Sequence, residues 1–160
     1  MTEKPESSDR GSLIALRVAY YGEVVAALFA VVDHRFAHPQ LLSVVVGLAL
    51  MSFGLVLRIA AGRALGKWWS LHVEIKPGQP LVQAGIYRFV RHPAYLGMLM
   101  VCLGIPIAFR SMWAAVVMAL GVWPAAGHRI EVEERVLASH FGDEYRAYAQ
   151  RTARLVPWLF

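Results

Sequence analysis

Cysteine is almost absent from this sequence of 160 residues, which contains only Cys102, within an apolar stretch. A single cysteine excludes an internal disulfide, and the apolar surroundings indicate a small buried side chain rather than a reactive thiol. Charged residues are also scarce, at 17%, whereas soluble domains have roughly 25%. Hydrophobic residues make up 58%, and the mean hydropathy is +0.48. This composition excludes an ordinary soluble domain and predicts a protein of the lipid bilayer.

Acidic residues are fewer than basic ones, and the net charge is +5. A basic protein can bind nucleic acid, but that function requires the cations to gather on one patch. Here the cations fall between the apolar runs, as the positive-inside rule describes. The sequence has no internal repeat and no low-complexity segment. It therefore predicts one membrane domain that does not bind nucleic acid.

Four apolar runs predict an all-α integral membrane fold with about four transmembrane helices. The predicted spans cover about residues 13–32, 41–61, 94–109 and 112–126. Arg110 and Ser111 alone separate the last two, so we expect a tight helical hairpin there. Residues 1–12 are expected to be a disordered tail, and residues 13–160 a single domain in which segments 62–93 and 128–160 form the polar part. Residues 128–160 read as a cytosolic amphipathic helical tail, in which Gly142 ends one helix and Asp143 caps the next.

The basic residues also predict the topology. Two lie before the first run, five between the second and third, and five after the fourth, so twelve of the sixteen fall on one side. Because cytoplasmic loops carry the excess of lysine and arginine, both termini are expected in the cytoplasm. Arg17 and Glu23 interrupt the first run, which argues against a cleaved signal peptide.

Some residues within or beside the runs require interpretation. Glu23 lies near the middle of the first run, where a carboxylate either is neutralised by Arg17 or Arg58 or faces a substrate site. His34 and His38 have the spacing of a metal pair, but Pro39 discourages a helix there and no third ligand is near. No metal site is predicted.

Packing of the helices is indicated by glycine and proline. Gly47 and Gly54 in the second run favour close contact with another helix. Pro124 is expected to kink the fourth span near its exit. Between the second and third spans, Trp68 and Trp69 mark a headgroup border, and the alternation in residues 71–75 predicts a short hairpin or an extended lid.

The segment from Gly85 to Gly97 joins a basic loop to the start of an apolar helix. Arg88 and Arg91 are followed by His92 and then by Pro93, a residue favoured at the first position of a helix. The beginning of a helix carries unpaired N–H groups and partial positive charge, so this junction is suited to an anion such as a carboxylate. The alternative is that the arginines only mark the cytoplasmic membrane boundary.

A pair of carboxylates, Glu133 and Glu134, lies in the tail on the same predicted side of the membrane. Paired carboxylates suit an ammonium group, and together with the anion site they would hold an amino-acid zwitterion. S-adenosylmethionine carries such a zwitterion, although these residues alone do not single it out. The alternative is a solvated helix face on which the glutamates match Arg129 and Arg135.

Several motifs together resemble the isoprenylcysteine carboxyl methyltransferase family, which is related to the phospholipid methyltransferases. The resemblance covers about the last 95 residues. It rests on Gly66–Ser70, Leu81–Val82 with Gly85–Arg88, Arg91–Gly97, Arg129–Glu134, Phe141–Tyr145 with Tyr148, and Arg154–Pro157. Family members often have proline where this chain has Ile86, and the first two runs carry no family signal.

The resemblance implies an integral-membrane methyltransferase that uses S-adenosyl-L-methionine without a Rossmann domain. The cofactor would lie in a cytosol-facing pocket between the hairpin and the tail, and a lipophilic or prenylated acceptor would enter from the bilayer. The implied cofactor-binding residues are Tyr87, Arg88, His92, Pro93, Tyr95, Leu96, Gly97, Glu133 and Glu134. The implied catalytic residues are Arg129, as a cation on the acceptor side, Glu133 and His92.

The acceptor decides the chemistry. A carboxylate is nucleophilic at neutral pH and needs no general base, so positioning and desolvation would supply the acceleration. A phenol or an amine, as in a phospholipid N-methyltransferase, would use His92 or a glutamate as proton acceptor. Membrane sterol reductases share a similar C-terminal portion, so an NADPH-dependent reductase is an alternative, as is a non-catalytic membrane protein.

Overall fold

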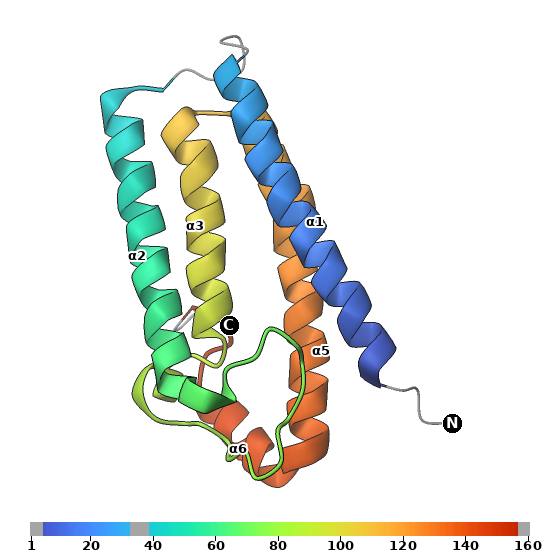
Figure 1. The fold of residues 1–160 in the computed structure, drawn as a ribbon. Helices are drawn as coiled ribbons and strands as arrows, with labels where there is room; N and C mark the ends of the chain where they lie inside the picture. Colours follow the sequence, from blue (N-terminus) through green and yellow to red (C-terminus); the bar gives the residue numbers. More distant parts are fainter. Residues whose placement is uncertain (1–4, 33–38, 157–160) are drawn as a thin grey trace.

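The computed structural model describes residues 5–32 and 39–156, and within these ranges it is helical, without a β-strand. The long helices stand side by side, and the shorter elements gather at one end (Figure 1). The α-helices are α1 (Pro5–Val32), α2 (Leu41–Leu65), α3 (Pro93–Phe109), α4 (Met112–Val117), α5 (Trp123–Phe141) and α6 (Asp143–Arg151). Two 3₁₀ turns, η1 (Gly66–Trp68) and η2 (Gly85–Arg88), and a π turn, η3 (Met118–Val122), complete the described elements.

The closest helix pair is α2 with α3, and glycines make the contact. A Cβ on Gly54 would lie 2.5 Å from the carbonyl oxygen of Gly97, and a Cβ on Gly47 would lie 2.6 Å from that of Gly104. Both helices repeat glycine after seven residues, so two contacts stack along the antiparallel pair. The predicted close packing at Gly47 and Gly54 is confirmed.

Helix α1 begins earlier than the sequence suggested. The expectation of a disordered tail over residues 1–12 is wrong from Pro5 onward, while residues 1–4 lie outside the described part of the chain. Ser12 is only 2% exposed, and its hydroxyl accepts a hydrogen bond of 2.8 Å from Arg129 on α5. This buried contact gives the polar first turns of α1 a tertiary partner that composition alone does not reveal.

The fourth apolar run and the predicted tail helix form one continuous rod, α4–η3–α5. Arg110, at φ 50°, and Ser111 make the tight turn after α3, and the Ser111 hydroxyl caps α4 by accepting from the Ala114 N–H at 3.2 Å. The helix then passes Pro124 because η3 precedes it: the N–H of Trp123 bonds to the carbonyl of Met118, five residues back. The wider turn accommodates a proline ring that would otherwise clash with the preceding turn.

Two predictions in the polar regions need correction. For residues 71–75 the hairpin is wrong and the extended lid stays a prediction, because the segment between η1 and η2 is irregular and its backbone makes local turns, such as Glu74 N–H to His72 O. Asp143 does not cap α6, because Gly142, at φ 56°, occupies the cap position and Asp143 begins the helix, where it pairs with Arg146.

Two helices, α1 and α2, have the length and apolar composition needed to cross a membrane, and α3 is a shorter apolar helix of 17 residues. Glu23 is completely buried against Cys102, and neither of its carboxylate oxygens has a hydrogen-bond partner among the described residues. Its predicted neutralisation by Arg17 or Arg58 is therefore wrong. Arg17 is exposed, and Arg58 bonds instead to the carbonyl of Ala94.

Candidate functional site

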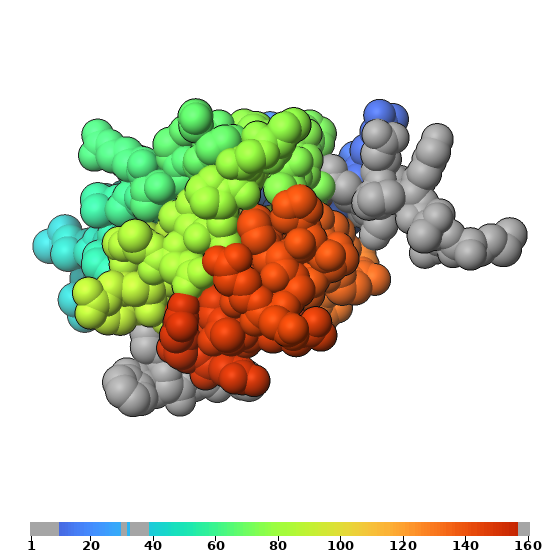
Figure 2. All heavy atoms as spheres, turned by 90° about the horizontal axis from the view of Figure 1, so that it is seen from below, coloured from blue at the N-terminus to red at the C-terminus, as the bar shows by residue number. Residues whose placement is uncertain are grey.

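A cavity lies at the end of the bundle where the irregular segment and α6 gather. Helices α1, α2, α3, α5 and α6 all contribute to its wall, and residues 68–75 and 79–82 of the irregular segment complete it. Seen from below, this segment and the tail lie side by side over the end of the bundle (Figure 2). Gln83 joins them through a hydrogen bond of 3.1 Å to Glu144 and a second bond from Arg151. The cavity thus has membrane-type helices on one side and polar chain on the other.

Three side chains form a polar cluster on the cavity wall. Tyr95, in the first turn of α3, lies on the cavity wall with Glu133 and Arg129 of α5, which act on its hydroxyl with opposite charges. Arg129 is 1% exposed and donates both to Ser12 and to the carbonyl of Leu71 at 2.5 Å. Because residues four apart share one face of a helix, Arg129 and Glu133 point to the same cavity.

Arg58 is a site residue that the sequence reasoning missed. It lies on α2, one turn beyond Gly54, lines the cavity, and donates to the carbonyl of Ala94 at 3.3 Å. Its guanidinium lies 5.8 Å from the ring centre of Trp69. An arginine inside an apolar run is itself a signal of a functional site, but this one was considered only as a counter-ion for Glu23.

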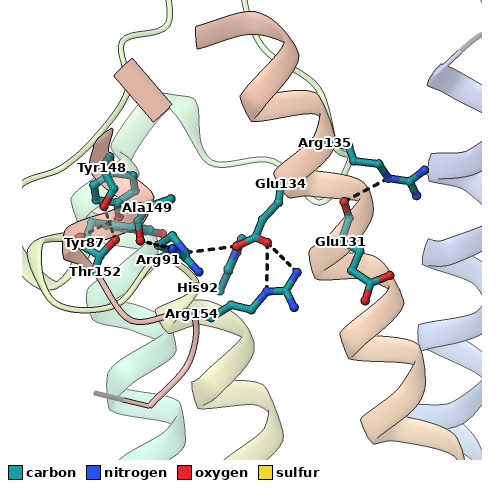
Figure 3. A network of polar contacts seen from close by, with 10 residues as sticks. All are labelled: Tyr87, Arg91, His92, Glu131, Glu134, Arg135, Tyr148, Ala149, Thr152 and Arg154. Carbon is teal, nitrogen blue, oxygen red and sulfur yellow. Dashed lines mark hydrogen bonds and ion pairs between the residues drawn. The ribbon is translucent and has the colours of Figure 1, made fainter. Parts of the chain in front are cut away.

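Glu134 lies at the centre of a separate ion cluster (Figure 3). One carboxylate oxygen is 3.2 Å from both Arg91 Nε and His92 Nε2, and the other accepts from Arg154 Nη2 at 2.6 Å and Nε at 3.0 Å. Burial alone would raise the pKa of Glu134, but hydrogen bonds and charge from His92 and Arg154 lower it to about 2. The carboxylate of Glu134 is therefore ionised at physiological pH.

The loop that carries Arg91 and His92 is also paired with the tail through its backbone. Val90 and Ala153 form a parallel bridge, in which the Arg91 N–H donates to Ala153 O at 2.8 Å and the Ala153 N–H to Phe89 O at 3.1 Å. Arg91 also donates to the carbonyl of Ala149. These contacts fix the loop to the segment after α6.

Three tyrosines of this region remain protonated near neutral pH. Burial is the main cause that raises the pKa of Tyr148 to about 12, and its hydroxyl donates to the carbonyl of Tyr87 at 2.7 Å. Burial, followed by the charge of Glu133, raises the pKa of Tyr87, and burial, followed by the charge of Glu134, raises that of Tyr145. None of the three is suited to act as a phenolate base near neutral pH.

The structure divides the predicted site residues into two groups. The cavity wall contains Tyr87, His92, Tyr95, Arg129 and Glu133. The residues outside the wall are Arg88, Pro93, Leu96, Gly97 and Glu134.

The residues outside the wall have other neighbours. Arg88 is exposed and its guanidinium lies 4.6 Å from the ring centre of Phe89. Gly97 faces α2, where a Cβ would lie 2.4 Å from the carbonyl oxygen of Gly54. Its small size thus serves the packing of two helices rather than the approach of a ligand.

No group of three or more histidine, cysteine, aspartate or glutamate side chains in residues 5–32 and 39–156 is arranged to hold a metal ion. His34 and His38, the pair considered above, lie outside the described residues.

Comparison with known proteins identifies similar chains. The sequence model of the isoprenylcysteine carboxyl methyltransferase family matches residues 45–139. The probable protein-S-isoprenylcysteine O-methyltransferase of Oryza sativa subsp. indica is 31% identical over 147 residues, which cover 85% of this chain and 76% of that protein. Methanethiol S-methyltransferase 1 of Bradyrhizobium diazoefficiens is 43% identical over 82 residues, which cover 46% of this chain and 25% of that protein.

The fold is also similar to a solved structure, that of a eukaryotic intramembrane Ras methyltransferase of the isoprenylcysteine carboxyl methyltransferase type. The TM-score is 0.69 at 24% identity, and the match covers 99% of this chain but 55% of that one. At this identity the likeness concerns the fold, and it extends to α1, which the family model does not cover. The family model begins at residue 45, within α2, so the expectation that the second run carries no family signal is wrong. The chain spans about half the length of the solved protein.

Proposed function

The chain belongs to the isoprenylcysteine carboxyl methyltransferase family, and on this premise we propose that it methylates an anionic acceptor with a lipophilic tail, most closely the carboxylate of an isoprenylcysteine. Membership of the family makes the chain a membrane methyltransferase. It favours methyl transfer over the reductase and the non-catalytic protein considered above. The family also implies S-adenosyl-L-methionine as the methyl donor.

The cavity has the donor set that this cofactor requires. Glu133 offers a carboxylate to the ammonium group, and the N-terminus of α3, at Ala94 and Tyr95, offers unpaired N–H groups to the carboxylate. Trp68 and Phe141 supply aromatic surface for the adenine. We therefore propose Tyr87, His92, Tyr95 and Glu133 as the cofactor-binding set.

The remaining predicted cofactor residues have structural tasks in this proposal. Pro93, Leu96 and Gly97 shape α3 and its contact with α2, and Arg88 lies at the exposed boundary. Arg129, with its hydrogen bonds to α1 and the irregular segment, holds Tyr95 and Glu133 in place.

The position of Arg58 is the observation that carries the choice of acceptor. Its guanidinium lies on the cavity wall where the membrane helices meet the polar region, and it makes one hydrogen bond and one contact with an aromatic ring. A cation there attracts a carboxylate and repels an amine that must become positively charged on methylation. This argues against the phospholipid N-methyltransferase alternative.

The chain's residues would act by orientation and exclusion of water. When bound, S-adenosyl-L-methionine supplies a methyl group on a sulfonium, and transfer to a carboxylate oxygen forms a C–O bond, breaks a C–S bond and moves no proton. Glu133 and the start of α3 would hold one reactant, and Arg58 would hold the other in line with it. The buried neutral tyrosines and the apolar wall would keep water out and strengthen these charge interactions.

We also propose four membrane crossings, made by α1, α2, α3 and the first part of the last rod, about residues 112–126. Basic residues concentrate at the end that carries the cavity, and the positive-inside rule assigns that end to the cytoplasm. The acceptor's apolar tail would reach the cavity from the bilayer past Leu13 and Leu16 of α1, which line the wall.

A thiol is the second candidate acceptor, because the 43% identity with the methanethiol S-methyltransferase is the highest among the relatives named above. A thiolate is also an anion that Arg58 would stabilise. The carboxylate and the thiol differ in one respect: the thiol must lose a proton before or during transfer.

The test measures methyl transfer by the purified protein in lipid nanodiscs with labelled S-adenosyl-L-methionine. The acceptors are a farnesylated cysteine, a small thiol and phosphatidylethanolamine. Transfer to the farnesylated cysteine, lowered at least about 100-fold by Arg58→Gln, is expected from the loss of a charged contact of roughly 3 kcal/mol. Transfer to phosphatidylethanolamine alone would overturn the acceptor assignment, and failure to bind S-adenosylhomocysteine would overturn the cofactor assignment.

A further inference from the structure

We infer that the two adjacent glutamates have different tasks: Glu133 binds the cofactor, and Glu134 is a positioning residue that clasps the tail segment Thr152–Arg154 to the loop carrying Arg91 and His92. The inference rests on the proposed function, because the cavity is taken as the cofactor site. It assigns to Glu134 a role in shaping this site without contact with the cofactor.

Helix geometry requires the two side chains to diverge. With 3.6 residues per turn, neighbours on a helix point about 100° apart. Glu133 lies on the cavity wall with Arg129, whereas Glu134 is absent from the wall and lies beside a shallow cleft lined by His128 and Arg135. One ligand in the cavity would therefore not be held by both carboxylates.

The carboxylate of Glu134 is already paired with side chains of this chain. It receives the side chains of Arg91, His92 and Arg154, which come from two segments about sixty residues apart in the chain (Figure 3). Its side chain is 18% exposed, and that of His92 is 2% exposed. A charge-assisted cluster of this kind is costly to break because each removed partner leaves another charged group unsatisfied. An ammonium group would have to displace an arginine to bind here.

The clasp determines the position of residues that do line the cavity. Arg91 and His92 touch Glu134 and also lie on the wall, and their backbone N–H groups bond to Ala153 and Arg154. Arg154, the third partner, ties the tail segment to Glu134 on α5. Loss of the Glu134 charge would therefore free both the loop and the tail. The wall would then be less ordered before the cofactor binds.

The test compares Glu134→Gln and Glu133→Gln, with Glu131→Gln as the matched control on the same helix. For Glu134→Gln, we expect a KM for S-adenosyl-L-methionine and a Kd for S-adenosylhomocysteine about 10- to 100-fold higher, as for other supporting residues of a binding site. The kcat at saturating cofactor should stay within about threefold of that of the unaltered protein. A merely structural defect would reduce the amount of active protein, and thus kcat, and leave KM unchanged.

Hydrogen exchange of the ligand-free protein supplies an independent measurement. The amides of Arg91, His92 and Ala153, which form the loop–tail bonds, should exchange at least about tenfold faster in Glu134→Gln and at the original rate in Glu133→Gln and Glu131→Gln. If Glu134→Gln weakens binding while these amides stay protected, Glu134 is a direct ligand and the inference is overturned. Unchanged binding in Glu134→Gln would overturn it too.

Arg154→Gln is the second variant, because it leaves Glu134 paired with Arg91 and His92 should Glu134→Gln fail to fold. We expect Arg154→Gln to raise the KM for S-adenosyl-L-methionine. In the double variant with Glu134→Gln, this KM should be less than about threefold higher than in Glu134→Gln alone, since the two side chains act through one contact. Full multiplication of the two effects would contradict the clasp. A failure of the proposed function is distinguishable, because the unaltered protein would then not bind S-adenosylhomocysteine while the exchange rates still report on the clasp.

Discussion

Replacing Gly54 with alanine should damage catalysis more than it damages the fold. The added Cβ would lie 2.5 Å from the carbonyl oxygen of Gly97 and 3.0 Å from the N atom of Val101, both of them backbone atoms that have no rotamer to change. Ordinary contact begins near 3.4 Å, so α2 and α3 must separate by about 0.9 Å, the difference between 3.4 and 2.5 Å. Overpacking of this kind costs about 1–3 kcal/mol. The gain from replacing a helical glycine offsets about 0.5–1 kcal/mol, which leaves a net loss of about 0–2.5 kcal/mol.

The consequence for the site follows from the position of Arg58, one turn after Gly54 on the same helix. The same helix contact includes the backbone of Arg58. An ideal Cβ on Gly97 would lie 2.9 Å from the backbone N of Arg58. A displacement near 1 Å in a positioning element can cost about 100-fold in rate. We therefore expect methyl transfer by Gly54→Ala to fall by about 100-fold, with a folded protein in the membrane.

Two controls separate the effects. Gly47→Ala creates a similar overlap, 2.6 Å, three turns away from Arg58, so it should lower the free energy of unfolding equally and the rate much less. Gly127→Ala meets no atom within 4 Å and should stabilise α5 by about 0.5–1 kcal/mol. Unfolding is followed in detergent micelles by titration with denaturing detergent, and activity by initial rates at saturating cofactor. Equal losses of rate in Gly54→Ala and Gly47→Ala would refute the argument that the contact positions Arg58.

Other expectations concern single side chains. The pKa of Glu134 is lowered to about 2, so the folded protein binds fewer protons than the unfolded chain at acid pH. The stability due to this group is complete above about pH 5 and is lost toward pH 2, and a pH series of unfolding should show this slope in the unaltered protein but not in Glu134→Gln. Glu23→Gln should fold with an unchanged or higher free energy of unfolding, because the buried carboxylate has no hydrogen-bond partner among the described residues; marked destabilisation would reveal an anionic role. Tyr148→Phe removes the hydrogen bond to Tyr87 and should cost about 1 kcal/mol, and an unchanged unfolding midpoint would show that this bond does not contribute.

Much of the fold was predictable because apolar runs and glycine spacing act locally. The hairpin at Arg110 and Ser111 follows from two polar residues between apolar runs, and the contact at Gly47 and Gly54 follows from the lack of side chains. The helical start of α1 was not predictable, because it depends on Ser12 reaching Arg129, a residue more than a hundred positions away.

The site was predictable to the level of its motifs but not to the level of individual roles. Helix periodicity indicates that Glu133 and Glu134 face different directions, yet only the packing of α5 against α3 shows which of them faces the cavity. Arg58 was missed because, within an apolar run, it was considered only as a counter-ion for Glu23. Its bond to Ala94 arises from the close approach of two helices, a tertiary fact.

The π turn at Met118–Val122 has a consequence for how this chain tolerates change in length. A wider turn holds one residue more than an α-helical path would, and one residue corresponds to about 100° of rotation. Deleting a single residue there would restore α-helical bonding and leave the rest of the rod in its present orientation, whereas the same deletion in the α-helical parts of the rod would turn Glu133 away from the cavity by about 100°. The number of residues between Ser111 and Glu133 therefore sets the direction in which Glu133 points as well as its distance along the rod. Insertions and deletions in this interval are compatible with the site only when they preserve that direction.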